Sequence, residues 1–142
     1  MIETAFFDTN VLIYIHDLRA PKKMAIAEAL FGRHCSEKRE VLSTQVLQEY
    51  YVNITRKTAR LPLWQARSLV AHYMRLNVVI VQPLHILQAI DLHIRFRLSF
   101  WDGLILATAK SAGASILFSE DFTHGRTYDG VRVENPFHGL LN

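Results

Sequence analysis

The sequence predicts an α/β fold in which helices cover both faces of a parallel sheet. Short apolar runs with the length of buried strands recur along the chain, and longer segments with apolar residues at helical spacing lie between them. This alternation is typical of parallel strands joined by helical crossovers, and strands covered on both faces are apolar throughout. With 142 residues, the chain is expected to form a single domain over 1–142.

The composition indicates a globular protein with a weak preference for polyanions. Half of the residues are apolar, which argues against disorder, and 16 Lys and Arg against 13 Asp and Glu leave a net charge of +3. The single cysteine, Cys35, is interpreted as a reduced structural thiol, typical of a cytoplasmic protein. We expect no secretory signal, because Asp8 interrupts the first apolar run, and no membrane span, because no apolar run is long enough.

The first predicted strand, 5–7, ends at an acid. Thr9 and Asn10 follow, and both residues start helices because their side-chain oxygens accept hydrogen bonds from free backbone N–H groups. Asp8 is therefore expected where a buried strand passes into helix 11–15, at the carboxyl edge of the sheet, where ligands bind in open α/β folds. The alternative is that Asp8 only caps that helix.

The next segments continue the alternation. The predicted elements are a helix over 21–34, a strand over 41–43, helices over 45–58 and 63–76, and a strand over 78–81. Ser43 or Thr44 begins helix 45–58 as its N-terminal cap. Glu49 lies about one turn into that helix and borders its apolar face, so it is expected to point neither fully into the core nor fully into water.

Helix 84–98 follows. Three of its large apolar residues are predicted to face the core: Leu87, Ile90 and Ile94. We interpret His85, Asp91 and His93 on this helix as surface or rim groups, because they do not share the single helical face that a metal site requires.

The last helix has clear start and stop signals. Ser99 to Asp102 match a capping box, in which a serine caps the helix and an acid follows three residues later. The helix is expected to end before Gly113, since glycine tolerates the left-handed conformation of a helix end. A fourth strand over 114–118 follows, Gly125 and Asp129-Gly130 mark loops, and 131–133 alternates like an edge strand.

Four acids distant in the sequence are predicted to meet at one edge of this sheet. Asp8 ends the first strand, and Asp121 closely follows the fourth. Asp102 lies at the start of a helix that runs antiparallel to the next strand, and Glu49 is on the helix that leaves the second strand at the same edge. Each acid taken alone has a simpler interpretation, as a helix cap, a capping-box acid, a turn residue or a solvated helix residue.

Such a cluster predicts a divalent cation. Carboxylates that lie close together raise one another's pKa, and a cation relieves this repulsion. Mg²⁺ and Mn²⁺ prefer carboxylate oxygens and water, and a bound Mg²⁺ retains waters that a substrate phosphate can displace. We therefore expect a Mg²⁺ (or Mn²⁺) site that acts on phosphodiesters.

Charge away from the four acids favours a polyanionic partner. Removing four negative charges from the net +3 leaves +7 on the rest of the chain. Arg56, Lys57, Arg95 and Arg97 are weak candidates for contacts with an RNA backbone. Ordinary solvated helix faces account for any one of them at least as well.

Four segments resemble those of a known family, the PIN-domain ribonucleases, which include the VapC-type toxins. They are FDTNVL at 7–12, STQVLQEYY at 43–51, the segment that begins FWD at 100–109, and LFSEDF at 117–122, which is followed by Gly125 and NPF at 135–137. These segments occur in the order typical of the family and span nearly the whole chain, whereas 61–98 carries no motif and is interpreted from its pattern alone.

The resemblance implies a PIN-like three-layer sandwich with a five-stranded parallel sheet in the order 3-2-1-4-5. It also implies Mg²⁺- or Mn²⁺-dependent endoribonuclease activity, restraint by a cognate antitoxin protein, and a homodimer. By position, the metal-binding and catalytic acids are Asp8, Glu49, Asp102 and Asp121. The polar supports are Thr9, Asn10, Ser119 and Glu120. The sequence leaves open whether Glu120 or its neighbour Asp121 faces the metal.

Three alternatives stay open. An aspartate-nucleophile phosphatase would attack phosphorus with Asp8, but such enzymes usually place a second acid two residues later, where this chain has Asn10. A non-catalytic RNA- or protein-binding module would not need the full set of acids. A housekeeping nuclease of the same fold, without a toxin role, is not distinguished from a toxin by the sequence.

Overall fold

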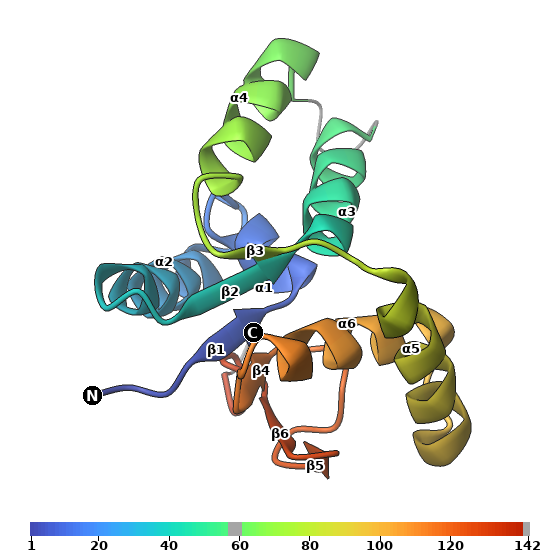
Figure 1. Ribbon diagram of the computed structural model, residues 1–142. Coiled ribbons are helices and arrows are strands. Elements are labelled where there is room, and N and C mark those ends of the chain that lie inside the picture. Colours follow the sequence, from blue (N-terminus) through green and yellow to red (C-terminus); the bar gives the residue numbers. More distant parts are fainter. Residues whose placement is uncertain (57–60, 141–142) are drawn as a thin grey trace.

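The computed structural model, which describes residues 1–56 and 61–140, confirms the predicted α/β architecture (Figure 1). Its strands are β1 (Ala5–Phe7), β2 (Glu40–Ser43), β3 (Val78–Val79), β4 (Ile116–Phe118), β5 (Thr127–Tyr128) and β6 (Val131–Glu134). Its helices are α1 (Thr9–Tyr14), α2 (Pro21–Ser36), α3 (Thr44–Thr55), α4 (Leu63–Tyr73), α5 (Pro83–Phe96) and α6 (Phe100–Ser111). Within the described ranges, no helix has the length and apolar character needed to cross a membrane.

The sheet has the strand order β3-β2-β1-β4-β6-β5. Five strands run parallel, since β1 pairs with β2 and β4, β2 also pairs with β3, and β4 also pairs with β6. Strand β6 holds the place predicted for the fifth strand, so the expected order 3-2-1-4-5 is confirmed for the parallel strands. Strand β1 lies inside the sheet, and all three of its residues are fully buried.

A sixth strand departs from the predicted five-stranded parallel sheet. Strand β5 pairs antiparallel with β6 across the turn at Asp129 and Gly130. The sequence predicts only a loop at these two residues. Both turn residues have a positive φ, 50° for Asp129 and 88° for Gly130. Two successive positive values are typical of type I′ turns, which join the strands of tight hairpins. The Asp-Gly pair was therefore a hairpin signal.

Helices cover both faces of the sheet (Figure 1). Helix α6 lies over one face, where it contacts β2 and β6, and α1 and α2 lie over the other. Helix α3 contacts α1 and α4, and Figure 1 shows α3 and α4 together above the sheet. In the core, Phe7 of β1 packs against Phe31 and Phe118 at ring-centroid distances of 4.9 and 5.1 Å. This packing supports the pairing of β1 with β4, which brings their carboxyl ends together.

Helix boundaries differ slightly from the predicted ones. The side chain of Ser43 caps α3 by accepting a hydrogen bond from the N–H of Val46 at 3.3 Å. Helix α3 ends at Thr55, and the predicted end at Thr58 lies outside the described residues. Strand β3 has two residues rather than the predicted four.

The buried face of α5 is not the predicted one. The three residues expected to face the core are exposed: Leu87 by 61%, Ile90 by 37% and Ile94 by 69%. Ala89 and Leu92 are buried instead. Helices α5 and α6 approach so closely that a Cβ on Gly103 would lie 2.5 Å from the carbonyl oxygen of Ala89. The face with small residues is buried because it lets the two backbones pack at this distance, and the longer apolar side chains then point outward.

Two polar residues away from the sheet edge have structural roles. His85 is 8% exposed rather than at the surface, because its Nδ1 accepts a hydrogen bond from the N–H of Gln82 at 2.9 Å and so caps the start of α5. Burial, with the charge of Glu40, raises the pKa of the Cys35 thiol to about 11. Cys35 therefore stays protonated at neutral pH, as a structural thiol does.

Because α5 and α6 approach closely at Gly103, adding a methyl group there is expected to lower the free energy of unfolding. Gly103→Ala is expected to destabilise the protein by about 1–3 kcal/mol, because the added group meets the Ala89 backbone rather than a side chain that can move. Gly32→Ala in α2 is the matched control, since nothing lies within 4 Å of the added Cβ. This control is expected to gain about 0.5–1 kcal/mol. Urea unfolding followed by circular dichroism measures both variants, and equal unfolding free energies would contradict the contact.

Candidate active site

The four acids lie at the carboxyl edge of the sheet. Asp8 directly follows β1, and Asp121 follows the end of β4. Asp102 is in the first turn of α6, and Glu49 is on α3. Burial raises the pKa of both Asp8 and Asp102, and the charges of Asp121 and Glu49 raise it further, so Asp121 and Glu49 are within electrostatic reach of both.

Asp8 is strongly perturbed by its surroundings. It is 4% exposed, and its two oxygens accept hydrogen bonds from the N–H of Thr9 at 2.8 Å and from the hydroxyl of Ser119 at 2.7 Å. Burial raises the pKa of Asp8 to about 7, while the bonds from Ser119 and Thr9 lower it and the charges of Asp121 and Glu49 raise it. Asp8 is therefore both the cap of α1 and part of the acidic edge, so its two interpretations do not exclude each other.

Asp102 has a related environment. It is partly buried, and burial raises its pKa, which the hydrogen bond with Ser99 lowers and the charges of Asp121 and Glu49 raise. The N–H of Asp102 donates to the Ser99 hydroxyl at 3.1 Å, which confirms the predicted cap. The N-terminal end of a helix also favours a negative charge, so α6 holds this carboxylate at the edge.

Glu49 has one donor on each carboxylate oxygen. The Thr9 hydroxyl donates to Oε2 at 3.2 Å, and Nε2 of Gln45 donates to Oε1 at 2.7 Å. Gln45 is buried and also donates to the carbonyl oxygen of Trp101 at 3.2 Å, so it joins α3 to the start of α6. Gln45 is not among the site residues predicted from the sequence, although its spacing of four residues from Glu49 on one helix was the available signal.

Asn10 and Ser119 connect the ends of β1 and β4. The side-chain amide of Asn10 donates to Asp121 at 3.1 Å and to the Ser119 hydroxyl at 3.3 Å. Ser119 donates to Asp8 and accepts from the N–H of Asp121 at 3.1 Å. One buried hydroxyl therefore links two of the acids, and it is surrounded by donors and acceptors that fix its orientation.

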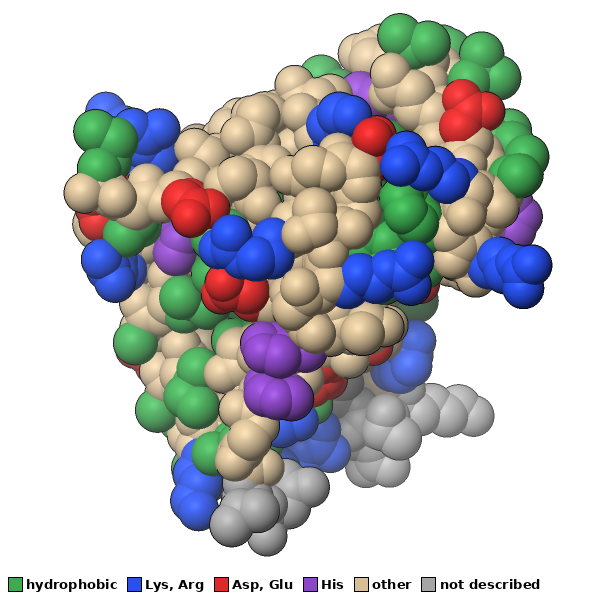
Figure 2. Space-filling model, turned by 90° about the horizontal axis from the view of Figure 1, so that it is seen from below, with side chains coloured by type: hydrophobic (Ala, Val, Ile, Leu, Met, Phe, Trp, Pro, Cys, Tyr) green, Lys and Arg blue, Asp and Glu red, His purple; other side chains and the backbone are tan. Residues whose placement is uncertain are grey.

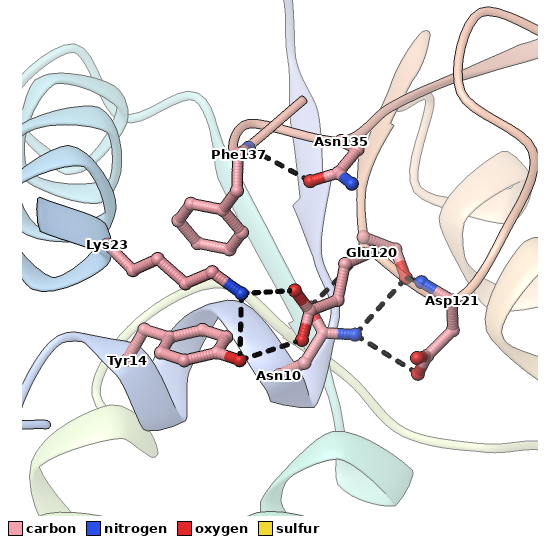
Figure 3. A network of polar contacts seen from close by, with 8 residues as sticks. Asn10, Tyr14, Lys23, Glu120, Asp121, Asn135 and Phe137 are labelled. Carbon is pink, nitrogen blue, oxygen red and sulfur yellow. Dashed lines mark hydrogen bonds and ion pairs between the residues drawn. The ribbon is translucent and has the colours of Figure 1, made fainter. Parts of the chain in front are cut away.

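Glu120 points away from the acidic edge (Figure 3). Its carboxylate accepts a hydrogen bond from the hydroxyl of Tyr14 at 3.0 Å and pairs with the ammonium group of Lys23 at 3.2 Å, whereas Asp121 contacts Asn10. The hydrogen bond with Tyr14, together with Glu120, raises the pKa of Lys23. Lys23 thereby links α2 to the segment after β4, and Asp121 rather than Glu120 lies among the acids.

The donor set fits a hard divalent cation. It consists of carboxylates, which Mg²⁺ and Mn²⁺ prefer. Burial raises the pKa of Asp8, and the charges of Asp121 and Glu49 raise it further. Within residues 1–56 and 61–140, no three His, Cys, Asp or Glu side chains are already close enough to surround one ion. A cation at this edge would offset the charges of Asp121 and Glu49 that act on Asp8.

The predicted basic contacts in the described residues lie on different elements. Arg56 is exposed after the end of α3, Arg95 pairs with Asp129 at 3.4 Å, and Arg97 ends α5 with a φ of 56°. Lys57 lies outside the described residues. On the face shown in Figure 2, Lys and Arg side chains form separate groups with acids between several of them. The described part of that face therefore has no continuous basic track.

Comparison with protein families identifies one match. The family model described as "PIN domain" matches residues 5–129, a range that contains all four acids. A comparison with curated proteins finds no match.

Solved structures share the fold at low sequence identity. A toxin-antitoxin complex from Klebsiella pneumoniae is 20% identical, with a TM-score of 0.66 and coverage of 93% of this chain and 97% of that chain. DNA-bound VapBC from Salmonella typhimurium is 17% identical, with a TM-score of 0.67 and coverage of 94% and 98%. The sarcin-ricin loop cleaving toxin VapC20 from Mycobacterium tuberculosis is 20% identical, with a TM-score of 0.60 and coverage of 82% and 89%.

The pKa of Asp8 predicts how stability depends on pH without metal. The folded protein keeps a proton on Asp8 up to about pH 7, whereas the unfolded chain releases it near the ordinary value of 3.8. The contribution of Asp8 to stability therefore falls as the pH rises between these values. Asp8→Asn removes this pH-dependent loss of stability, because an amide carries no ionisable proton. The substitution is expected to stabilise the metal-free protein by roughly 1–3 kcal/mol above neutral pH.

Urea unfolding in excess chelator, at about pH 5 and about pH 8, measures this effect. The stabilisation of Asp8→Asn relative to the wild type should be larger at the higher pH. Asp91→Asn, at an exposed aspartate on α5, is the control and should leave the pH dependence unchanged. An equal difference between Asp8→Asn and the wild type at both pH values would contradict a proton held on buried Asp8.

Proposed function

The chain belongs to the PIN domain family, and from that premise we propose that it is a Mg²⁺- or Mn²⁺-dependent endoribonuclease, the toxin of a toxin–antitoxin pair. The observation that carries the proposal is the acidic edge, where burial raises the pKa of Asp8 and Asp102 and the charges of Asp121 and Glu49 raise it further. Such a set weakens the metal-free fold, which indicates a functional rather than a structural role.

Four acids would hold the cation: Asp8, Glu49, Asp102 and Asp121. When bound, the ion supplies the positive charge that stabilises a phosphodiester under attack and lowers the pKa of a water. Neutral polar side chains orient these carboxylates toward the ion, namely those of Thr9, Asn10, Gln45 and Ser119. In known metal sites, substitution of a side chain that hydrogen-bonds a metal ligand lowers metal affinity or activity by roughly 10–100-fold.

The proposal includes an RNA substrate and a cognate antitoxin protein in the cytoplasm. Of the similar structures, one is described as a toxin-antitoxin complex, one as VapBC and one as a toxin that cleaves the sarcin-ricin loop. The shared fold, together with a complete set of acids in this chain, supports the same class of activity here. Large apolar side chains exposed on α5, among them Leu87 and Ile94, support a homodimer through that helix.

The runner-up enzyme, an aspartate-nucleophile phosphatase, has less support. Asn10 occupies the position of its second acid, and the Asn10 amide is engaged by Asp121 and Ser119. Asp8 is 4% exposed and accepts two hydrogen bonds, which disfavours its oxygens as nucleophiles. A non-catalytic binding module of this fold would gain nothing from a buried acid, Asp8, whose pKa the charges of neighbouring acids raise further.

Cleavage of RNA tests the proposal directly. With Mg²⁺ or Mn²⁺, the protein is expected to cut a labelled oligoribonucleotide, and excess chelator is expected to stop the reaction because the acids then lack their cation. Asp8→Asn and Asp102→Asn should abolish cleavage while retaining the fold, as measured by gel electrophoresis and circular dichroism. Asp91→Asn should cleave as the wild type does, since Asp91 lies on the exposed side of α5.

RNA cut equally well in excess chelator would rule out the metal mechanism. Release of phosphate from small phosphoesters, with RNA left intact, would favour the phosphatase. Growth arrest on expression of the wild type, relieved by Asp8→Asn, would separate a toxin from a housekeeping nuclease.

Substitutions of the neighbouring acids Asp121 and Glu120 are expected to change Mn²⁺ affinity by different amounts. Asp121→Asn is expected to weaken Mn²⁺ binding by at least the roughly 10–100-fold typical of a lost support, because Asp121 lies among the acids. Glu120→Gln is expected to change Mn²⁺ affinity much less, since Glu120 contacts Lys23 and Tyr14 instead. Isothermal titration calorimetry measures both, and a larger loss for Glu120→Gln would reverse the assignment.

A further inference from the structure

An open pocket lies beside Glu49, at the margin of the hydrogen-bonded network of the acids. Its volume is about 400 Å³, and it is lined by Gln45, Gln48, Glu49 and Trp101. Trp101 directly precedes Asp102 and is 63% exposed. This exposure leaves unused the favourable free energy that an aromatic ring gains when another group covers it. The pocket thus places a large flat apolar surface next to two of the acids.

The wall of this pocket is fixed relative to the acids. Nε2 of the buried Gln45 donates to Glu49 at 2.7 Å and to the carbonyl oxygen of Trp101 at 3.2 Å. The Trp101 ring also packs edge-on against Phe100, with centroids 5.1 Å apart and the planes at 79°. Both walls belong to helices, α3 and α6, so the pocket is preformed rather than part of a loop.

We propose that this pocket binds a nucleobase of the RNA strand next to the bond that is cut, with the base stacked on the indole of Trp101; this inference rests on the proposed ribonuclease function. A base offers the flat face that an indole can stack against, and stacking on aromatic side chains is a general mode of binding to single strands.

The polar side of the pocket also fits a base rather than a phosphate. The Glu49 carboxylate repels a phosphate but accepts hydrogen bonds from the amino and N–H groups of bases. The exposed amide of Gln48 has both a donor and an acceptor, which matches the mixed edge of a base. The strand's phosphates would then lie toward the cation at the acidic edge, on the other side of Glu49.

Trp101→Ala tests the stacking surface. The substitution keeps the backbone carbonyl that Gln45 contacts, so Mn²⁺ affinity should be unchanged. For a single-stranded oligoribonucleotide, KM should rise roughly five-fold or more, with a smaller change in kcat, because a stacked base contributes equally before and during the reaction. Trp101→Phe should restore most of the KM, since it keeps an aromatic ring.

Trp64→Ala is the matched control. Trp64 is 74% exposed and, like Trp101, is the second residue of its helix, but it lies on α4 and does not line the pocket. Its loss should leave KM and kcat as in the wild type. An unchanged KM in Trp101→Ala, an equal rise in Trp64→Ala, or a loss of Mn²⁺ affinity in Trp101→Ala would overturn the inference.

Fluorescence gives a test that does not require cleavage. Because the sequence has two tryptophans, Trp64→Phe leaves Trp101 as the only indole. With Ca²⁺ in place of Mg²⁺, an oligoribonucleotide should quench this signal, and one with abasic sites throughout should quench it less. Equal quenching by both would overturn base stacking. A wild type that fails to cut RNA would instead contradict the proposed function, so the two failures are distinguishable.

Discussion

The burial of Asp8 between two strand ends is the constraint on which the rest of the site depends. Asp8 follows a fully buried strand, and its carboxylate is 4% exposed. Removing a carboxylate from water is unfavourable unless donors or a cation compensate for it. Thr9 and Ser119 provide two donors, yet burial still raises the pKa of Asp8 to about 7. The remaining need for positive charge is what makes the edge suitable for a divalent cation.

A layer of neutral polar side chains holds the acids in place. Ser119, Asn10 and Gln45 each contact more than one group, and between them they link β1, β4, α3 and α6. Neutral donors suit this role because they orient carboxylates without neutralising them, so the negative charge stays available to a cation. Lys23 forms its ion pair with Glu120, and among the described residues no ion pair joins a Lys or Arg side chain to Asp121.

Packing between α5 and α6 decides which residues of α5 are buried and which are exposed. Close contact between Ala89 and Gly103 turns the larger apolar residues of α5 outward. Trp101 is exposed at the start of α6 and directly precedes Asp102. The molecule therefore has a flat aromatic surface beside the acidic edge and an apolar helix face on α5, and each is suited to a different kind of partner.

The sequence pattern by itself indicated a parallel sheet with four acids at strand ends and on the adjoining helices, whereas the strand order came from the resemblance to a family. Strand length, cap residues and alternation are local properties, and they suffice to place Asp8 and Asp102 along the chain. Only the tertiary structure decided which residues contact one another. It directed Glu120 toward Lys23 and Asp121 toward Asn10, buried Ala89 rather than Leu87, and brought Gln45 against Trp101. These outcomes depend on competition between neighbouring surfaces for close packing and for hydrogen-bond partners, which no local pattern encodes.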